Sequence, residues 1–186
     1  MAAIAADAEV RIETARLVLR APADSDVEAI VAQLSDPVVS ATTARIPHPF
    51  GPDDAMGWID KCRHEREAGE GLALVVERRA DRALVGAAGI YLQTAVAPII
   101  LGYWIGRPYW QQGYATEAAR GLLDHAFAAL AIERVHASVY PGNPASMRVL
   151  AKLGFRVVGP IREPAPARGG MRDAILHEIR ADEWRV

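Results

Sequence analysis

The segment LGYWIGRPYWQQGYATEA, Leu101–Ala118, decides how this chain folds, because its pattern changes at a single glycine. The first residues are apolar, aromatic or β-branched, as is typical of a strand, whereas apolar residues from Thr116 onward recur at helical spacing. Between the two patterns lie Gly106, Pro108 and Gly113, which are residue types that favour turns. The segment therefore predicts a strand, a loop and a helix in direct succession.

The loop before this helix has the properties of an anion site. The first N–H groups of a helix have no helical acceptor and carry partial positive charge. Gly113 lacks a Cβ, so its backbone can adopt a positive φ and approach a phosphate closely. The segment has neither G-x-G-x-x-G nor G-K-[ST], which argues against the two common nucleotide-binding loops. The alternative is a turn that binds nothing.

The rest of the chain alternates between strand and helix patterns. Apolar or alternating runs predict strands at 16–20, 71–79, 83–93, 98–106, 133–140, 155–161 and 171–179. Helical spacing, caps and helix-ending glycines predict helices at 26–35, 52–69, 116–130 and 143–154, with a long loop at 36–50. Asp24 and Ser25 are the expected N-caps of the first helix. This order predicts a mixed α/β fold with adjacent antiparallel strands at 71–106.

Composition limits the kinds of partner that we expect. The 186 residues are 51% hydrophobic and 24% charged, which fits one domain over residues 1–186. The net charge of −2 lacks the positive bias that nucleic acid or an anionic membrane would require. The N-terminal residues do not resemble a signal peptide, and a single cysteine, Cys62, fits a reducing compartment. We expect a cytoplasmic protein without nucleic-acid or membrane partners.

Two motifs carry a resemblance to a known family. WQQGYA, Trp110–Ala115, resembles the acetyl-CoA loop [RQ]-x-x-G-x-[GA] of the GNAT superfamily of N-acetyltransferases. NPASMRVLAKLGF supplies the second element, an Asn that begins a helix and a Lys-x-Gly-Phe that ends it. RLVLR, LGYWIGRPYWQQGYATEA and the closing GGMRDAILHEIRADEW look like the branch that acetylates N-terminal amines of ribosomal proteins. This similarity extends over about residues 11–184.

The resemblance implies a fold and a set of cofactor contacts. It implies a mostly antiparallel sheet, flanked by helices, whose fourth strand splays from the fifth at a bulge, so that pantetheine can pair with the exposed backbone. Acetyl-CoA would be the cosubstrate, with no metal. Its expected contacts are backbone groups of the fourth strand, the pyrophosphate loop and one asparagine: Tyr103, Trp104, Ile105, Gln111, Gln112, Gly113, Tyr114, Ala115, Thr116 and Asn143. Asn143 before Pro144 is equally a good N-cap.

The proton carriers used by many relatives are missing. Leu150 occupies the position of the usual tyrosine acid, and Ser138 that of the usual glutamate base. The ribosomal-protein branch is similar in having a serine at Ser146, whose hydroxyl could protonate the departing thiolate or simply bond the helix start. Glu163, which we expect in a loop between the last two strands, is the candidate base, although it could be an ordinary solvated carboxylate.

The chemistry favours a weakly basic acceptor. An α-amine of pKa about 7.7 to 8.0 loses its proton at pH 7 for about 1 to 1.4 kcal/mol, whereas a lysine amine costs about 4.6 kcal/mol. A site without a strong base therefore suits an α-amine or a weakly basic aryl amine, and the resemblance favours direct acetyl transfer to the α-amine of a peptide or protein. The loop Thr42–Phe50 and the helix 52–69 would cover the acceptor. The alternatives are a small-amine acetyltransferase, acting on an antibiotic or polyamine, and a non-catalytic acyl-CoA-binding module. A homodimer is possible on family grounds.

Overall fold

The computed structural model describes residues 10–92 and 97–184. Its strands form one sheet in the order β1-β2-β3-β4-β5-β6-β8-β7, in which only the β5–β6 pair is parallel. The strands are β1 (Arg11–Glu13), β2 (Leu17–Arg20), β3 (Gly71–Arg78), β4 (Leu84–Leu92), β5 (Ile99–Ile105), β6 (Arg134–Val139), β7 (Arg156–Ala165) and β8 (Gly170–Arg180). The expected mixed α/β fold with a mostly antiparallel sheet is confirmed.

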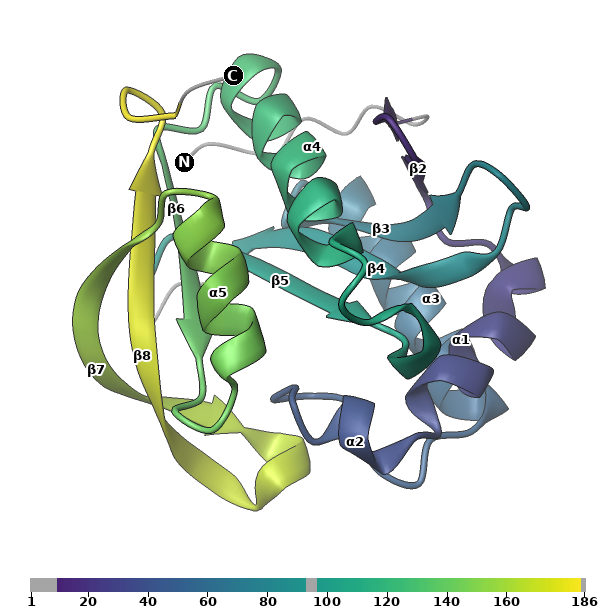
Figure 1. Cartoon of the computed structure of the whole chain (residues 1–186). Coiled ribbons are helices and arrows are strands. Elements are labelled where there is room, and N and C mark those ends of the chain that lie inside the picture. The colour runs from purple at the N-terminus through teal and green to yellow at the C-terminus, as the bar shows by residue number, and fades with distance from the viewer. Residues whose placement is uncertain (1–9, 93–96, 185–186) are drawn as a thin grey trace.

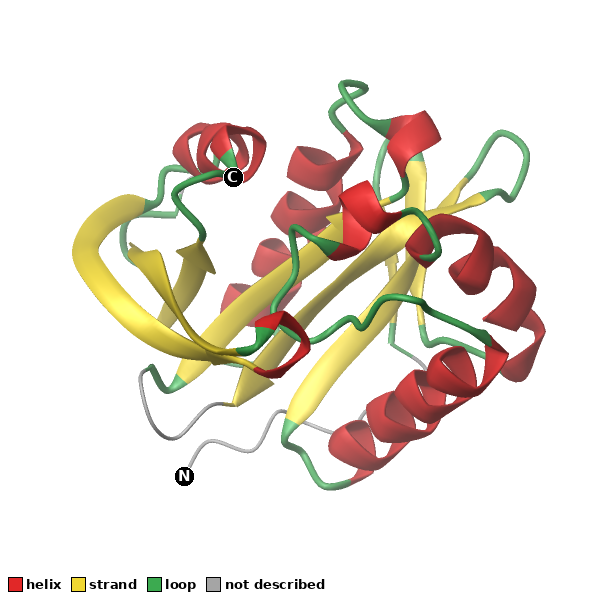
Figure 2. Ribbon diagram, turned by 90° about the horizontal axis from the view of Figure 1, so that it is seen from below, coloured by secondary structure: helices red, strands yellow, loops and turns green. Residues whose placement is uncertain are grey.

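Helices cover both faces of this sheet. They are α1 (Val27–Leu34), α2 (Pro37–Ser40), α3 (Pro52–Glu67), α4 (Tyr114–Ala128) and α5 (Pro144–Lys152). Figure 1 shows α4 and α5 on the near face, with α3 behind the sheet. Figure 2, the view from below, shows the sheet between these helix layers and the long curved β7–β8 hairpin at one side. Short 3₁₀ turns lie at Asp24–Asp26, Arg107–Tyr109 and Pro166–Arg168.

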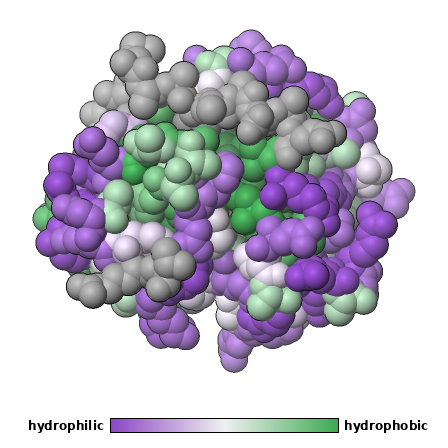
Figure 3. Space-filling model, turned by 90° about the horizontal axis from the view of Figure 1, so that it is seen from above, coloured by the Kyte–Doolittle hydropathy of each residue, from purple (hydrophilic) through white to green (hydrophobic). Residues whose placement is uncertain are grey.

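The central strands are apolar on both faces because each face meets a helix layer. One cluster joins β3, β4 and β5 to α4 and α5, with Leu74, Leu122 and Leu150 fully buried. The second cluster joins the opposite face to α1 and α3, with Ile30 and Ile59 at its centre. On the face seen from above, apolar side chains gather near the middle and polar side chains surround them (Figure 3).

The sheet opens between β5 and β6. The two strands share a single ladder pair, Ile100 with His136, so the rest of β5 has no strand partner on that side. The expected splay between these strands is confirmed. The expected bulge is not, because β5 pairs with β4 without a register shift from Ile99 to Ile105. The opening therefore arises from diverging strand directions, which Figure 1 shows, and not from an extra residue.

Several element boundaries differ from those expected. The first helix has no cap from Asp24 or Ser25, because a 3₁₀ turn precedes α1 and the Asp26 carboxylate accepts the Ala23 N–H instead. Part of the expected loop 36–50 forms α2, with the Asp36 side chain accepting the Val38 N–H. β1 was not expected. Helix α4 begins at Tyr114, two residues earlier than predicted.

The last hairpin is much longer than predicted. Strand β7 continues to Ala165 although it contains Pro160 and Pro164, and its register with β8 extends to Gly170. Proline is tolerated there because β7 is the edge strand of the sheet, so one side of its backbone has no neighbouring strand that needs an N–H donor. Glu163 therefore lies within a strand, opposite Arg172, and not in a loop. The placement of Glu163 in a loop was wrong for this reason.

An ion cluster with two buried carboxylates joins β2 to β3 and to the first residue before α1. Arg20 contacts the Asp26 carboxylate at 2.8 Å and the Glu77 carboxylate at 3.1 Å, and both acids are buried. Burial acts to raise the pKa of Asp26, but hydrogen bonds from Arg20 and the Ala23 N–H outweigh it, so the pKa lies below its ordinary value. The carboxylate therefore stabilises the fold in its charged form.

An Asp26→Asn variant should lose about 2 to 3 kcal/mol of unfolding free energy at pH 7, because the partly buried Arg20 keeps its charge with one partner fewer. A depressed folded pKa contributes stability above the unfolded pKa of about 3.9 and loses it as the pH falls further. Urea unfolding at a series of pH values should thus show the gap between the two proteins narrowing below about pH 4. A gap that stays constant down to pH 3 would contradict this account.

Membrane-spanning helices and clusters of metal-binding side chains are absent from the described residues. Within residues 10–92 and 97–184, no helix is long and apolar enough to cross a membrane. The same residues contain no group of three or more His, Cys, Asp or Glu side chains able to hold a metal ion. The first nine residues, on which the expectation about a signal peptide partly rests, lie outside the described part of the chain, as does Gln93, the last residue of the predicted strand 83–93.

Candidate active site

The loop before α4 has the backbone conformation expected of an anion site. Gly113 is the N-cap of α4 with φ of +82°, and Gln111 also has a positive φ of +62°. The loop from Arg107 to Gly113 is largely exposed, and α4 has 15 residues. The first-turn N–H groups of Tyr114, Ala115 and Thr116 therefore lie at an accessible helix N-terminus. An exposed nest of this kind can accept a phosphate.

Arg16 and Glu117 hold this loop against β2. The Arg16 guanidinium donates to the Gln112 carbonyl at 3.0 Å and pairs with the Glu117 carboxylate at 2.7 Å. The same carboxylate accepts from the Thr14 hydroxyl at 2.7 Å. Burial acts to raise the pKa of Glu117, but these hydrogen bonds and the Arg16 charge together lower it. Tying the Gln112 carbonyl to Arg16 directs it toward β2.

Strand β5 presents part of its backbone at the open edge of the sheet. Gly106 donates its N–H to the Val85 carbonyl, and in an antiparallel pair alternate residues point to opposite sides. Tyr103 and Ile105 consequently direct their backbone groups toward β6, whereas the backbone of Trp104 faces β4. The indole Nε1 of Trp110 donates to the Ile105 carbonyl at 2.6 Å. Tyr103 is therefore best placed for a ligand that pairs with this edge.

Asn143 and Ser146 lie at the start of α5, across the opening from β5. The Asn143 Oδ1 accepts the Ser146 N–H at 3.1 Å, so the N-cap role is observed. This bond uses the carbonyl oxygen of the amide and leaves its two N–H donors for another acceptor. The Ser146 hydroxyl shares a hydrogen bond of 2.8 Å with the Tyr103 hydroxyl. Burial, only partly offset by Ser146, raises the pKa of Tyr103 to about 12, so this phenol stays protonated at neutral pH.

The loop and the opening meet the requirements of a cofactor that combines a pyrophosphate with an extended amide arm. Gly113 has a φ of +82°, which side-chain-bearing residues rarely adopt, and a Cβ added there would lie 3.4 Å from the Arg16 guanidinium. The edge of β5 supplies hydrogen-bonding groups of the kind that a strand-like ligand uses. The residues present therefore fit coenzyme A.

The comparison with known families decides the classification. The family model described as "Acetyltransferase (GNAT) domain" matches residues 16–156. The chain belongs to the GNAT acetyltransferase family. It is 30% identical over 169 residues to the uncharacterised N-acetyltransferase YoaA of Bacillus subtilis, covering 90% of this chain and 95% of that protein.

Solved structures of GNAT acetyltransferases share this fold. RimJ of Mycobacterium smegmatis in complex with CoA-disulfide is 26% identical, with a TM-score of 0.77 over 94% of this chain and 88% of that one. The ribosomal-protein-S5-alanine acetyltransferase of Vibrio fischeri is 21% identical and shares the fold, with a TM-score of 0.78 over 95% and 100% of the two chains. Structural neighbours of this GNAT acetyltransferase thus include ribosomal-protein acetyltransferases.

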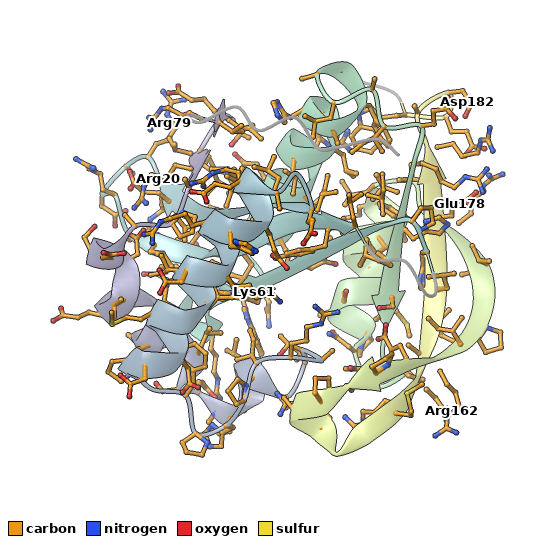
Figure 4. The ribbon with its side chains drawn as sticks, turned by 180° about the vertical axis from the view of Figure 1, so that it is seen from behind. Arg20, Lys61, Arg79, Arg162, Glu178 and Asp182 are labelled. Atoms are coloured by element: carbon orange, nitrogen blue, oxygen red, sulfur yellow. The ribbon has the colours of Figure 1, made fainter. Side chains whose placement is uncertain are left out.

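Asn143 also lines a pocket of this GNAT acetyltransferase. This pocket of about 540 Å³ is bounded by Ala41 and Thr42, by the turn Tyr140–Asn143 and by the β7–β8 hairpin. Its volume lies in the range of small-ligand sites. Arg162 and Asp173 at its rim pair with each other at 3.4 Å, and Figure 4 shows Arg162 projecting outward from the hairpin. Asn143 is therefore shared between the β5–α5 opening and this pocket.

Tyr140 connects Glu163 to the pocket. The hydroxyl of Tyr140 is buried and makes no hydrogen bond within the described residues, while Arg172 stacks on its ring at 5.5 Å. Burial and the nearby Glu163 carboxylate raise the pKa of Tyr140, while Arg172 and Arg168 act to lower it. Glu163 does not line the pocket itself, but its ladder partner Arg172 does.

Sequence reasoning missed four residues of this GNAT site. Trp110 stands where the family pattern has Arg or Gln, and its bond to Ile105 could not be foreseen from spacing. Arg16 and Tyr140 reach the site from strands or turns distant in sequence, so no local pattern marks them. The long hairpin also brings Arg168 to the loop 40–46, 125 residues away in sequence from Thr43. Leu150, at the usual acid position, is fully buried in the core.

Proposed function

We propose that this GNAT acetyltransferase transfers the acetyl group of acetyl-CoA directly to the α-amine of a peptide or protein. The observation that carries the proposal is the position of Asn143, which caps α5 across the opening from β5 and also lines the pocket beside Tyr140. The β5–α5 opening with the Gly113 loop would hold acetyl-CoA, and the pocket beside Tyr140 would hold the acceptor. The neighbouring acetyltransferases of ribosomal proteins support an acceptor of this kind.

The chain's own residues then have distinct tasks. The amides of Gln111 to Thr116 would bind the pyrophosphate, and the edge of β5 at Tyr103 and Ile105 would bind the pantetheine arm. An N–H donor of Asn143 would orient that arm near the thioester. These contacts fix the reacting carbon between the opening and the pocket, which converts a collision of two molecules into a positioned reaction.

Two proton transfers accompany the acetyl transfer. As the amine nitrogen bonds to the carbonyl carbon, the C–S bond breaks and the amine loses a proton. Glu163 would accept that proton, directly or through water, and the Ser146 hydroxyl would pass a proton to the thiolate of coenzyme A while regaining one from water. The Tyr103 hydroxyl, protonated at neutral pH, would stabilise the Ser146 oxygen. An α-amine suits this arrangement because it loses its proton at pH 7 for only about 1 to 1.4 kcal/mol.

Thiol release from acetyl-CoA tests the proposal. The acceptors should be short peptides with a free N-terminal amine, the same peptides with a blocked N-terminus and an internal lysine, polyamines, and aminoglycosides. We expect turnover only with the free α-amine peptides. Turnover confined to polyamines or aminoglycosides would favour a small-amine acetyltransferase instead.

Melting curves with and without acetyl-CoA provide the accompanying measurement. A ligand that binds only the folded protein adds about 2.7 kcal/mol of stability at one hundred times its dissociation constant. Stabilisation by acetyl-CoA without turnover of any acceptor would indicate an acyl-CoA-binding module. Absence of both stabilisation and turnover would contradict the cofactor assignment.

A further inference from the structure

The middle of the loop between α2 and α3 has little apolar anchoring of its own. Val39 and Phe50, at its two ends, are buried in the second core cluster. Between them, Ala41, Thr42 and Arg45 are exposed, and only Ile46 packs partly against that cluster. A segment with so few buried apolar contacts opens easily unless polar bonds hold it.

Arg168 supplies those bonds from the β7–β8 hairpin. Its Nε donates to the Thr43 carbonyl at 3.1 Å, and its Nη2 donates to the carbonyls of Ser40 and Ile46, the latter at 2.7 Å. The Nη1 group donates to the neighbouring Ala167 carbonyl, and the Ala167 N–H donates to the Ala44 carbonyl. One guanidinium thus joins three points of the loop to the hairpin.

These anchor points bracket the wall of the acceptor pocket. Ala41 and Thr42, which line the pocket, lie between the Ser40 and Thr43 carbonyls that Arg168 holds. The opposite wall comes from Met171, Arg172 and Asp173 of the same hairpin. Arg168 does not line the pocket itself, but it lies in the turn of the hairpin that supplies one wall and bonds the backbone of the segment that supplies the other.

We propose that Arg168 is a positioning residue for the acceptor: it fixes the loop 40–46 against the hairpin and so sets the width of the acceptor pocket. The identity of the acceptor rests on the proposed function, whereas the role of Arg168 as a clamp, meaning that it holds the loop 40–46 against the hairpin, does not. Arginine suits this task because its planar fork reaches several carbonyls at once, whereas a lysine ammonium is a point donor at the end of a flexible stem.

The test compares Arg168→Ala and Arg168→Lys with the unmodified full-length protein. Hydrogen–deuterium exchange of the amides in residues 40–46 should accelerate at least about tenfold in Arg168→Ala and by an intermediate amount in Arg168→Lys. With a short peptide bearing a free N-terminal alanine as the probe, the KM for the peptide should rise about tenfold in Arg168→Ala, because the pocket wall is no longer held in place. The KM for acetyl-CoA should not change.

Arg156→Ala is the matched control. Arg156 is an exposed arginine of the same hairpin whose ion pairs, with Glu178 and Glu183, lie at its other end, where Figure 4 labels Glu178. This variant should leave both loop exchange and the peptide KM unchanged. Unchanged exchange in Arg168→Ala, or faster exchange with an unchanged peptide KM, would overturn the proposal. If the unmodified protein acetylates no acceptor, the proposed function fails, and loop exchange alone then decides whether Arg168 is the clamp.

Discussion

Replacing Gly113 with aspartate should weaken acetyl-CoA binding by at least about 100-fold while the fold survives. Two unit charges about 5 Å apart repel by about 3 kcal/mol at an effective dielectric constant of 20, which corresponds to a factor of about 100 or more. The new carboxylate would lie next to the amides that should bind the pyrophosphate, with its Cβ about 3.4 Å from the Arg16 guanidinium. Asp tolerates the positive φ of this position better than most residues, so the helix start should be retained.

Gly113→Asn separates the effect of the aspartate's negative charge on acetyl-CoA binding from the effect of its side-chain size. Asparagine has nearly the same size and the same tolerance of positive φ, but it is neutral. It should weaken binding less than aspartate does. Calorimetric titration with acetyl-CoA gives the affinities, and the melting temperature of each unliganded variant reports the fold. Equal affinities of the unmodified and aspartate proteins would rule out a phosphate at this loop.

Replacing Ser146 with alanine should lower kcat by about 100-fold, because a positioned proton donor contributes about 10² to 10⁴ in rate. Acetyl-CoA affinity should stay near that of the unmodified protein, since the cap from Asn143 uses the backbone N–H of this residue and not its hydroxyl. The measurement is the steady-state rate with the acceptor peptide at saturating acetyl-CoA. An unchanged kcat would exclude Ser146 as the acid.

Tyr103→Phe and Ser146→Thr complete the comparison. The phenylalanine variant removes the 2.8 Å hydrogen-bond partner of the Ser146 hydroxyl but leaves the β5 backbone intact, so it should lower kcat less than Ser146→Ala does. Threonine keeps a hydroxyl and should restore most of the rate. If Tyr103→Phe reduces acetyl-CoA affinity without affecting kcat, the phenol serves binding and not proton transfer.

Much of the fold could be predicted from local patterns. The apolar runs of β3, β4 and β5 and the helical spacing of α4 depend on which faces are buried, and burial leaves a period in the sequence. Gly113 was identified for a similar reason, since a positive φ is a local property that favours glycine. The boundaries at α2 and β7 were missed because prolines in an isolated sequence indicate a loop. Pro37 instead follows the N-cap Asp36 at the start of α2, and Pro160 and Pro164 lie in an edge strand.

The sequence by itself determined most of the order of elements, the positive φ in the loop at Gly113 and the helix capped by Asn143, because each depends on backbone conformation within a few residues. Only the tertiary structure decided that Tyr103 meets Ser146, that Arg16 braces the loop, and that Arg168 joins the hairpin to residues 40–46. Those contacts join residues separated by 43 or more positions. They depend on where the divergence of β5 and β6 and the curvature of β7 and β8 bring distant side chains together, and no local pattern encodes that.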